Sequence, residues 1–291
     1  MKYAAILFRT FFFVCLFTSS ALSTESNEIF YSQAKRGVIR LEHFETVKQE
    51  GSFNTILRNV PDGTAFFVVG YKQLFIVSAR HIVEQPYDLH ARVQTKNVRT
   101  GEQKVFLLKL PRDKWVYHSY NGDKETHYVD VAVMRIVFMR NWDIVSFLYE
   151  TKESSDHDKN QLPYEDPEPP SPIIVFGFPA DIGFTLEKQN PIGRFGIISM
   201  KAGEKFIKVN GDKYAEERYC LLDARIFGGN SGSPVMNQTR FEDPKPKLLG
   251  LVTATSNALD FAIMEPTSRI RETIDLAKDK DAQGNWEEIR R

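Results

Sequence analysis

A serine lies in a glycine-rich turn in the second half of the chain, in the segment Gly228-Gly229-Asn230-Ser231-Gly232-Ser233-Pro234-Val235. A nucleophilic serine needs an exposed hydroxyl on a tight turn, with backbone N–H groups that converge on the oxyanion formed during attack on a carbonyl. Glycines permit such a turn and leave room for a substrate backbone. The same segment is also typical of a surface turn, so its chemistry depends on partner residues elsewhere in the sequence.

His81 has the setting expected of a general base. Residues 63–68 and 74–77 are typical of two strands of a hairpin, and His81 follows the end of the second strand. Its near-neutral pKa suits it to take and return the proton of a serine. A half-buried structural histidine is the alternative. The other five histidines lack this setting: His43, His90, His118, His127 and His157.

Asp130 begins the apolar run Val131–Ile136. An acid at the mouth of a buried strand is costly unless it accepts hydrogen bonds, and the Nδ1–H of a histidine is a suitable donor. The alternative is an aspartate that caps a turn before the strand. A histidine, an aspartate and a serine in these three contexts together indicate nucleophilic catalysis.

The elements that must position these residues are short strands separated by Gly, Pro, Asn and Asp, which favour an antiparallel barrel or sandwich. The expected strands are Thr64–Val69, Leu74–Ser78, Lys104–Leu110, Val131–Val137, Ile173–Phe176, Gly196–Met200, Phe206–Val209, Lys247–Thr253 and Phe261–Met264.

The domain organisation follows from shifts in composition. Residues 151–172 are polar and proline-rich, which indicates either a linker between two β domains, residues 24–150 and 173–265, or a surface loop within one domain. Residues 266–291 are expected to form a closing helix over Arg269–Lys278 and a tail that is loose after Asp279. Ile270, Ile274 and Leu276 offer that helix a partial apolar face.

Charge and the N-terminal segment exclude some function classes. The 38 basic and 38 acidic residues balance, so no nucleic-acid or anionic-membrane partner is indicated. Lys2 and Arg9 precede an apolar run, Phe11–Phe17, that passes into small and polar residues. This pattern predicts a signal peptide, residues 1–23, and a secreted or periplasmic protein. The alternative, a membrane anchor, needs about 20 apolar residues, so no stable membrane insertion is expected after cleavage.

The cysteines exclude an internal disulfide. Cys15 leaves with the signal peptide, and Cys220 is then the one cysteine of the mature chain. Cys220 could be a nucleophile, but it lies in the apolar run Tyr219–Leu222. That setting favours a buried, inert thiol.

The segments around His81, Asp130 and Ser231 resemble the three signature blocks of the chymotrypsin-fold, or trypsin-like, serine proteases. The similarity runs from roughly Asp62 to Ile270 and is greatest to the HtrA-like and V8-like (glutamyl endopeptidase) branches, without a PDZ domain. Two positions depart from relatives. Asn230 stands where animal digestive proteases carry the acid that pairs with a new N-terminus. Val252 stands where V8-like enzymes carry a glutamate-reading histidine, so glutamate specificity is not supported.

The resemblance implies an all-β fold of two antiparallel six-stranded β-barrels with a C-terminal α-helix. It implies a secreted endopeptidase that acts on protein or peptide substrates through a catalytic triad of His81, Asp130 and Ser231, without a metal or cofactor. A catalytically silent binding or adhesion protein on the same scaffold is the alternative. The oxyanion hole would use the N–H groups of Gly229 and Ser231. The specificity pocket would be lined by Arg225, Ile226, Thr253, Ala254 and Thr255.

Overall fold

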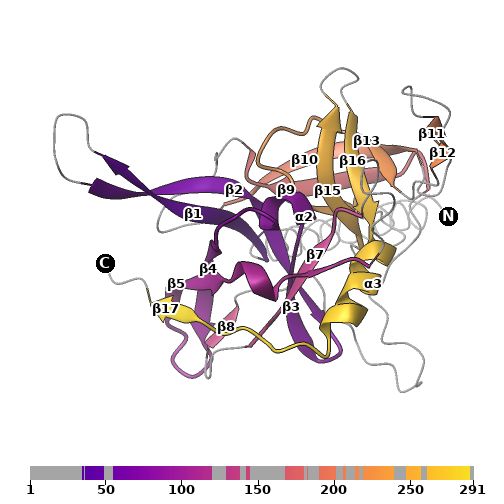
Figure 1. Cartoon of the computed structure of the whole chain (residues 1–291). Helices are drawn as coiled ribbons and strands as arrows, with labels where there is room; N and C mark the ends of the chain where they lie inside the picture. The colour runs from indigo at the N-terminus through magenta and orange to yellow at the C-terminus, as the bar shows by residue number, and fades with distance from the viewer. Residues whose placement is uncertain are drawn as a thin grey trace, which may run out of the picture.

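The structure is a computed structural model that describes residues 35, 37–48, 55–119, 129–137, 142–144, 168–179, 182, 190–200, 206–207, 214–215, 219–238, 247–256 and 261–288. Strands dominate these ranges (Figure 1). The predicted signal peptide, residues 1–23, and most of the predicted linker, residues 151–172, lie outside the described residues. None of the helices in the described ranges has the length and apolar character needed to cross a membrane.

The first half of the chain forms a nine-stranded sheet whose adjacent strands pair antiparallel. Its main path runs β17-β5-β4-β1-β2-β3-β7-β6, and β8 pairs with β4. The strands are β1 (Val38–Lys48), β2 (Thr55–Gly70), β3 (Gln73–Ser78), β4 (Leu89–Asn97), β5 (Gln103–Leu110), β6 (Val116–Tyr117), β7 (Ala132–Ile136), β8 (Trp142–Ile144) and, from the C-terminus, β17 (Trp286–Glu288). The helix α2 (Arg80–Val83) and the 3-10 turn η1 (Arg112–Lys114) connect these strands.

The second half forms a closed six-stranded barrel in the order β10-β13-β16-β15-β14-β9. Its strands are β9 (Pro172–Gly177), β10 (Ile192–Met200), β13 (Cys220–Asp223), β14 (Pro234–Asn237), β15 (Leu248–Ser256) and β16 (Phe261–Pro266). A separate pair is made by β11 (Phe206–Ile207) and β12 (Tyr214–Ala215). The helix α3 (Thr267–Ala277) follows the barrel. The predicted all-β class with a C-terminal helix is confirmed.

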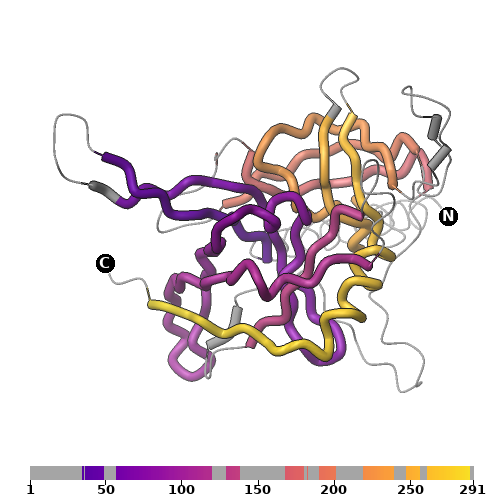
Figure 2. Tube along the Cα trace, in the orientation of Figure 1, coloured from indigo at the N-terminus to yellow at the C-terminus, as the bar shows by residue number. Residues whose placement is uncertain are grey.

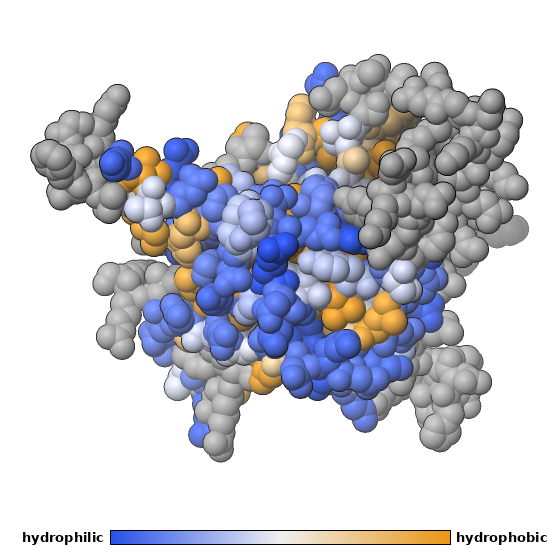
Figure 3. All heavy atoms as spheres, viewed as in Figure 1, coloured by the Kyte–Doolittle hydropathy of each residue, from blue (hydrophilic) through white to orange (hydrophobic). Residues whose placement is uncertain are grey.

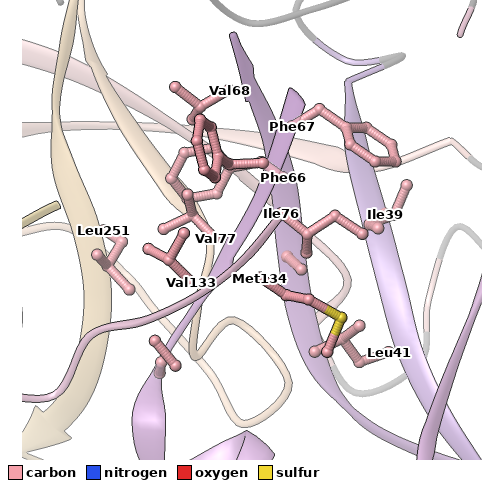
Figure 4. Packing of buried hydrophobic residues seen from close by; sticks show 14 of the residues in the cluster. Ile39, Leu41, Phe66, Phe67, Val68, Ile76, Val77, Val133, Met134 and Leu251 are labelled. Atoms are coloured by element: carbon pink, nitrogen blue, oxygen red, sulfur yellow. The ribbon is translucent and has the colours of Figure 1, made fainter. Parts of the chain in front are cut away.

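Three strands form a wall shared by two hydrophobic cores. Along β9, Ile173 and Val175 face the core of the second barrel, while Ile174 and Phe176 face the core of the first half. Successive side chains of a strand point to opposite faces, so one strand can serve both cores. β14 and β15 also supply side chains to both cores, and Figure 4 shows Leu251 of β15 packed beside Val77 and Val133 of the first sheet. This shared wall fixes the two halves against each other.

Two long strands, β1 and β4, were not expected from the sequence. Their apolar alternation is broken by Arg40, Glu42 and Arg92, which are nevertheless buried. Arg40 and Arg92 both bind the carboxylate of Glu42, the latter at 2.9 Å from Nε to Oε1. Buried charges are tolerated when they are paired. The apolar pattern therefore did not indicate β1 and β4, because part of their buried face consists of paired charged residues.

The helix α3 begins two residues before the predicted start and presents a different face. Ile270, Ile274 and Ala277 are buried in the core of the first half, whereas Leu276 is 42% exposed. Residues three or four apart share one side of a helix, so Ile274, four after Ile270, and Ala277, three after Ile274, continue the row, whereas Leu276 does not. The expectation for Leu276 was wrong.

The C-terminal tail is ordered along the first sheet, contrary to the prediction of a loose segment. Gln283 exchanges hydrogen bonds with Arg135 of β7 and with Val137, which follows that strand. Further along the tail, β17 pairs with β5 at the opposite side of the sheet. The Trp286 indole also donates to the Val137 carbonyl at 3.0 Å. The tail therefore bridges the two ends of the open sheet and closes it as a barrel strand would (Figure 2). Exposed strand edges are a liability, which such a segment removes.

We expect truncation after Lys280 to destabilise the protein by about 3 kcal/mol, because the variant loses several backbone hydrogen bonds worth about 1 kcal/mol each and the packing of Trp286. Thermal unfolding measures the loss. The Trp286→Phe variant, which keeps an aromatic ring but lacks the N–H bonded to Val137, should lose much less. A truncated protein as stable as the full chain would show that the tail does not close the sheet.

His43 lies in a cluster of polar side chains near the base of the β1–β2 hairpin. His43 Nδ1 lies 2.8 Å from Asp62, its Nε2 lies 3.1 Å from Glu45, and its ring stacks on Tyr87 at 4.0 Å. Burial lowers the pKa of His43, but the hydrogen bonds to Asp62 and Glu45 outweigh it, so the pKa is raised above 6.5. Because both ring nitrogens face carboxylates, the protonated form satisfies the cluster best.

The pH dependence of stability follows from that raised pKa. The contribution of His43 is complete below the unfolded-state pKa of about 6.5 and is lost as the pH rises through the folded-state value. We expect the advantage of wild type over the His43→Gln variant in free energy of unfolding to shrink from about pH 5.5 to about pH 8.5. Urea unfolding at a series of pH values tests this, and a constant or growing difference would contradict it.

Candidate active site

Strand pairing brings His81 and Asp130 together. β3 and β7 are neighbours, with Ser78 opposite Ala132. The helix α2, which follows β3, therefore lies beside Asp130, two residues before β7. His81 Nδ1 lies 2.6 Å from Asp130 Oδ2, and the backbone N–H of His81 donates to Oδ1 at 2.9 Å. The carboxylate thus holds the imidazole by two contacts. Nδ1 carries the proton in this arrangement, which leaves Nε2 free to accept one.

The pair lies where a substrate could reach it. The His81 side chain is 35% exposed, whereas Asp130 is 16% exposed. The backbone N–H of Asp130 also donates to Glu265 Oε1 of β16 at 3.2 Å, which ties the aspartate to the second barrel. An imidazole open to solvent and a shielded carboxylate are the arrangement expected of a general base and its orienting group.

Ser231 lies in a tight turn between β13 and β14. Gly229 and Gly232 adopt φ values of 91° and 84°, in the left-handed region that favours glycine. The turn is fixed to β15 because Gly232 donates to the Val252 carbonyl at 2.7 Å and Val252 donates to Ser233 at 2.9 Å. The Ser231 hydroxyl is therefore presented from a rigid support.

β2 contacts both the turn that carries Ser231 and the helix that carries His81. The N–H of Thr64 donates to the Ser231 carbonyl at 2.9 Å, and its hydroxyl donates to the Gly229 carbonyl at 2.7 Å. A Cβ on Gly63 would lie 3.1 Å from both the Ile82 side chain and the Ser231 carbonyl oxygen. Gly63 thus occupies the narrow space between the turn and the helix that carries His81, so all three predicted triad residues gather at one seam between the two halves.

The Ser231 hydroxyl donates to the Thr253 carbonyl at 3.4 Å. Within the described residues no hydrogen bond joins it to His81. Catalytic hydrogen bonds are often long or misaligned without substrate and tighten when substrate binds. The geometry thus brings His81 and Ser231 to the same seam without a direct hydrogen bond between them.

The chain matches the family model described as "Trypsin-like peptidase domain" over residues 63–241, which is more than half of its length and contains all three predicted triad residues. The chain belongs to this family. It is therefore a serine protease with the chymotrypsin-like fold.

Two solved structures are similar to this chain, and the first of them supports the fold. The "HtrA-type protease AlgW with decapeptide" is 16% identical, with a TM-score of 0.53 over 87% of this chain and 68% of the other. The "Rv3671c protease from M. tuberculosis, active form" is 12% identical, with a TM-score of 0.46 over 88% of this chain and 86% of the other. Among proteins with curated descriptions, none matches the sequence.

In this trypsin-like domain the predicted pocket residues lie on both sides of β16. β16 pairs with β13 on one side and β15 on the other, with Ala262 opposite both Leu222 and Thr255. The segment after β13 and the end of β15 therefore flank the start of β16. Arg225, Ala254 and Thr255 are exposed, whereas Ile226 and Thr253 are buried. Exposure leaves Arg225 available to solvent or substrate, whereas Ile226 packs in the core of the second barrel.

Sequence reasoning missed several residues of the peptidase site. Thr64 binds the turn that carries Ser231, and Glu265 binds Asp130, both across the seam. Arg194 of β10 stacks on Phe227, 4.6 Å from its ring centroid, just before the turn. Thr64 at the start of the apolar run Ala65–Val69 was the one local signal available, since a buried hydroxyl needs a partner. The other contacts depend on strand register.

Other features of the peptidase domain are structural. Cys220 is buried within the core of the second barrel, as its sequence setting predicted. In the ranges that the structure describes, no group of three or more His, Cys, Asp or Glu residues gathers in a way that could hold a metal ion. The face shown in Figure 3 is mainly hydrophilic with scattered hydrophobic areas.

Proposed function

We propose that the protein is an exported serine endopeptidase that cleaves peptide bonds through a covalent acyl-enzyme intermediate. The observation that carries the proposal is the His81–Asp130 pair, 2.6 Å apart, at the same seam as the glycine turn of Ser231. Ser231 Oγ attacks the carbonyl carbon, His81 Nε2 takes its proton, and the developing oxyanion accepts hydrogen bonds from Gly229 and Ser231. His81 then protonates the leaving amine, and water hydrolyses the ester by the same route.

Asp130 would keep the proton of His81 on Nδ1 and stabilise the imidazolium that forms during each transfer. Its carboxylate is already oriented by the His81 backbone N–H, so little rearrangement is needed. We expect a specificity pocket formed by Arg225, Ile226 and Thr253–Thr255 to receive the substrate side chain that precedes the cleaved bond. Protein or peptide substrates follow from the peptidase family.

A fluorophosphonate probe tests the proposal. We expect stoichiometric labelling of the folded wild type on Ser231, detected by mass spectrometry of the intact protein and of its peptides. The Ser231→Ala variant should not be labelled, and Ser233→Ala should still be labelled because Ser233 is fully buried. Folded wild-type protein that resists the probe and cleaves no member of a peptide library would instead favour a binding protein.

Export is a second part of the proposal. The basic and apolar segment before Ser23 predicts cleavage there, so the exported protein should begin at Thr24. N-terminal sequencing of protein recovered outside the cytoplasm checks this. An intact N-terminus on protein held in the cytoplasm would contradict it.

A further inference from the structure

The oxyanion turn, Phe227–Ser233, has a defined hydrogen-bond pattern. Asn230 N–H donates to the Phe227 carbonyl at 3.1 Å, and Ser233 N–H donates to the Asn230 carbonyl at 2.9 Å. Because N–H and C=O point in opposite directions across a trans peptide bond, the second bond directs the Ser231 N–H away from Ser233. In the described part of the chain, the N–H groups of Gly229 and Ser231 have no acceptor. Such unpaired donors suit an incoming oxyanion.

The Asn230 side chain clamps this turn from within. Asn230 is only 2% exposed. Its Nδ2 donates to the Phe227 carbonyl at 3.2 Å, and its Oδ1 accepts a hydrogen bond from Ser233 Oγ at 3.5 Å. The amide therefore ties the start of the turn to its end, and it uses a donor and an acceptor at once. A carboxylate in the same place could not donate to Phe227.

Gly177 packs against the clamp. A Cβ on Gly177 would lie 2.0 Å from Ser233 Oγ and 2.4 Å from Asn230 Oδ1. The end of β9 therefore has no room for any side chain beneath the clamp. Thr64 holds the opposite side of the turn through the Gly229 carbonyl at 2.7 Å. The turn is thus fixed by neutral groups on both sides, all of which belong to the folded domain.

We propose that Asn230 is a positioning residue that holds the oxyanion turn in its substrate-ready shape, so that no newly cut N-terminus is needed to form it. This inference rests on the proposed function, because it assigns a role in the reaction of Ser231. An acid at this position would need a buried cation to neutralise it. The amide of Asn230 finds both its partners inside the turn instead.

The Asn230→Asp variant tests the clamp without changing its shape. The new carboxylate oxygen would face the Phe227 carbonyl across 3.2 Å, where it repels. We expect kcat to fall about a hundred- to a thousandfold, the effect of one lost oxyanion donor, with KM within about threefold. Asn97→Asp is the matched control, because Asn97 Oδ1 accepts hydrogen bonds from the backbone N–H groups of Arg99 and Thr100 and an aspartate keeps both.

A larger residue beneath the clamp separates positioning from simple destabilisation. Gly177→Ala should lower kcat per folded molecule, because its methyl group displaces Ser233 Oγ and Asn230. Adding Ser233→Ala should not restore kcat, because the methyl group would still lie 2.4 Å from Asn230 Oδ1 and the amide would also lose its Ser233 partner. A merely structural role predicts fewer folded molecules with unchanged kcat.

Hydrogen exchange gives a readout that does not depend on activity. In the ligand-free wild type, the amides of Asn230 and Ser233 should be protected, and Asn230→Asp should expose them. A wild type that neither labels nor turns over but keeps these amides protected would refute the proposed function and leave the clamp intact. A mature chain with a blocked N-terminus should match the free chain in kcat. Unprotected amides, a wild-type kcat in Asn230→Asp, or dependence on a free N-terminus would each overturn the inference.

Discussion

Replacing Asp130 with asparagine is expected to lower kcat by about 10⁴ while the protein stays folded. Asparagine has the shape of aspartate, and its carbonyl oxygen can keep the 2.9 Å bond from the His81 backbone. Its NH₂ group would then face Nδ1, where a donor meets a donor. His81 escapes this clash by moving its proton to Nε2, which can then no longer accept the proton of Ser231. The loss thus comes from the wrong tautomer.

The measurement is kcat on the best substrate from a peptide library, with thermal unfolding as the check on folding. Asp113→Asn serves as the matched control, because that carboxylate is 76% exposed and pairs only loosely with Lys114 at 3.6 Å. The control should retain wild-type activity. If Asp130→Asn kept more than about a tenth of wild-type kcat, Asp130 would not orient His81 during catalysis.

Gly232→Ala is expected to cost about 3 kcal/mol or more in free energy of unfolding. A Cβ at this position would lie 2.0 Å from the Thr64 carbonyl oxygen and 2.6 Å from Ser78 Oγ. Backbone φ is also 84°, which side chains rarely adopt. The turn cannot retreat, because Gly232 N–H is bonded to Val252 on its other side. The backbone strain and the steric overlap of the new methyl group therefore both lower the free energy of unfolding.

Gly228→Ala is the matched comparison from the same turn, since a Cβ there meets nothing within 4 Å. We expect that variant to unfold within about 1 kcal/mol of wild type, whereas the melting temperature of Gly232→Ala should fall by about 6 °C or more. Differential scanning fluorimetry of both variants suffices. Equal melting temperatures would mean that the close packing of β2 against the nucleophile turn is not a feature of the folded protein.

The three candidate triad residues could be found from the sequence because each has a local signal. Ser231 is surrounded by glycines, His81 follows a hairpin strand, and Asp130 precedes an apolar run. Each signal is contained within a few residues, so no knowledge of strand register is needed. Continuous apolar runs likewise indicated strands that are buried on both faces, such as β3 and β9.

The supporting residues could not be found in the same way. Thr64 contacts the turn of Ser231 from a strand far earlier in the chain, and Gly177 reaches Asn230 only because β9 pairs with β14. Such contacts depend on which strands become neighbours and in which register, and local pattern does not specify either. The tail escaped prediction for the same reason, since its polar residues gain their partners only from the free ends of the first sheet.

Comparing Ser231→Ala, His81→Ala and the double variant tests the central claim most directly, because residues that act as one unit lose their effect together. Each single variant should lower kcat by about 10⁶, and the double variant should lose no more than either one. Losses that multiply in the double variant, or a His81→Ala variant that keeps nearly full activity, would show that the imidazole and the hydroxyl do not work at one site.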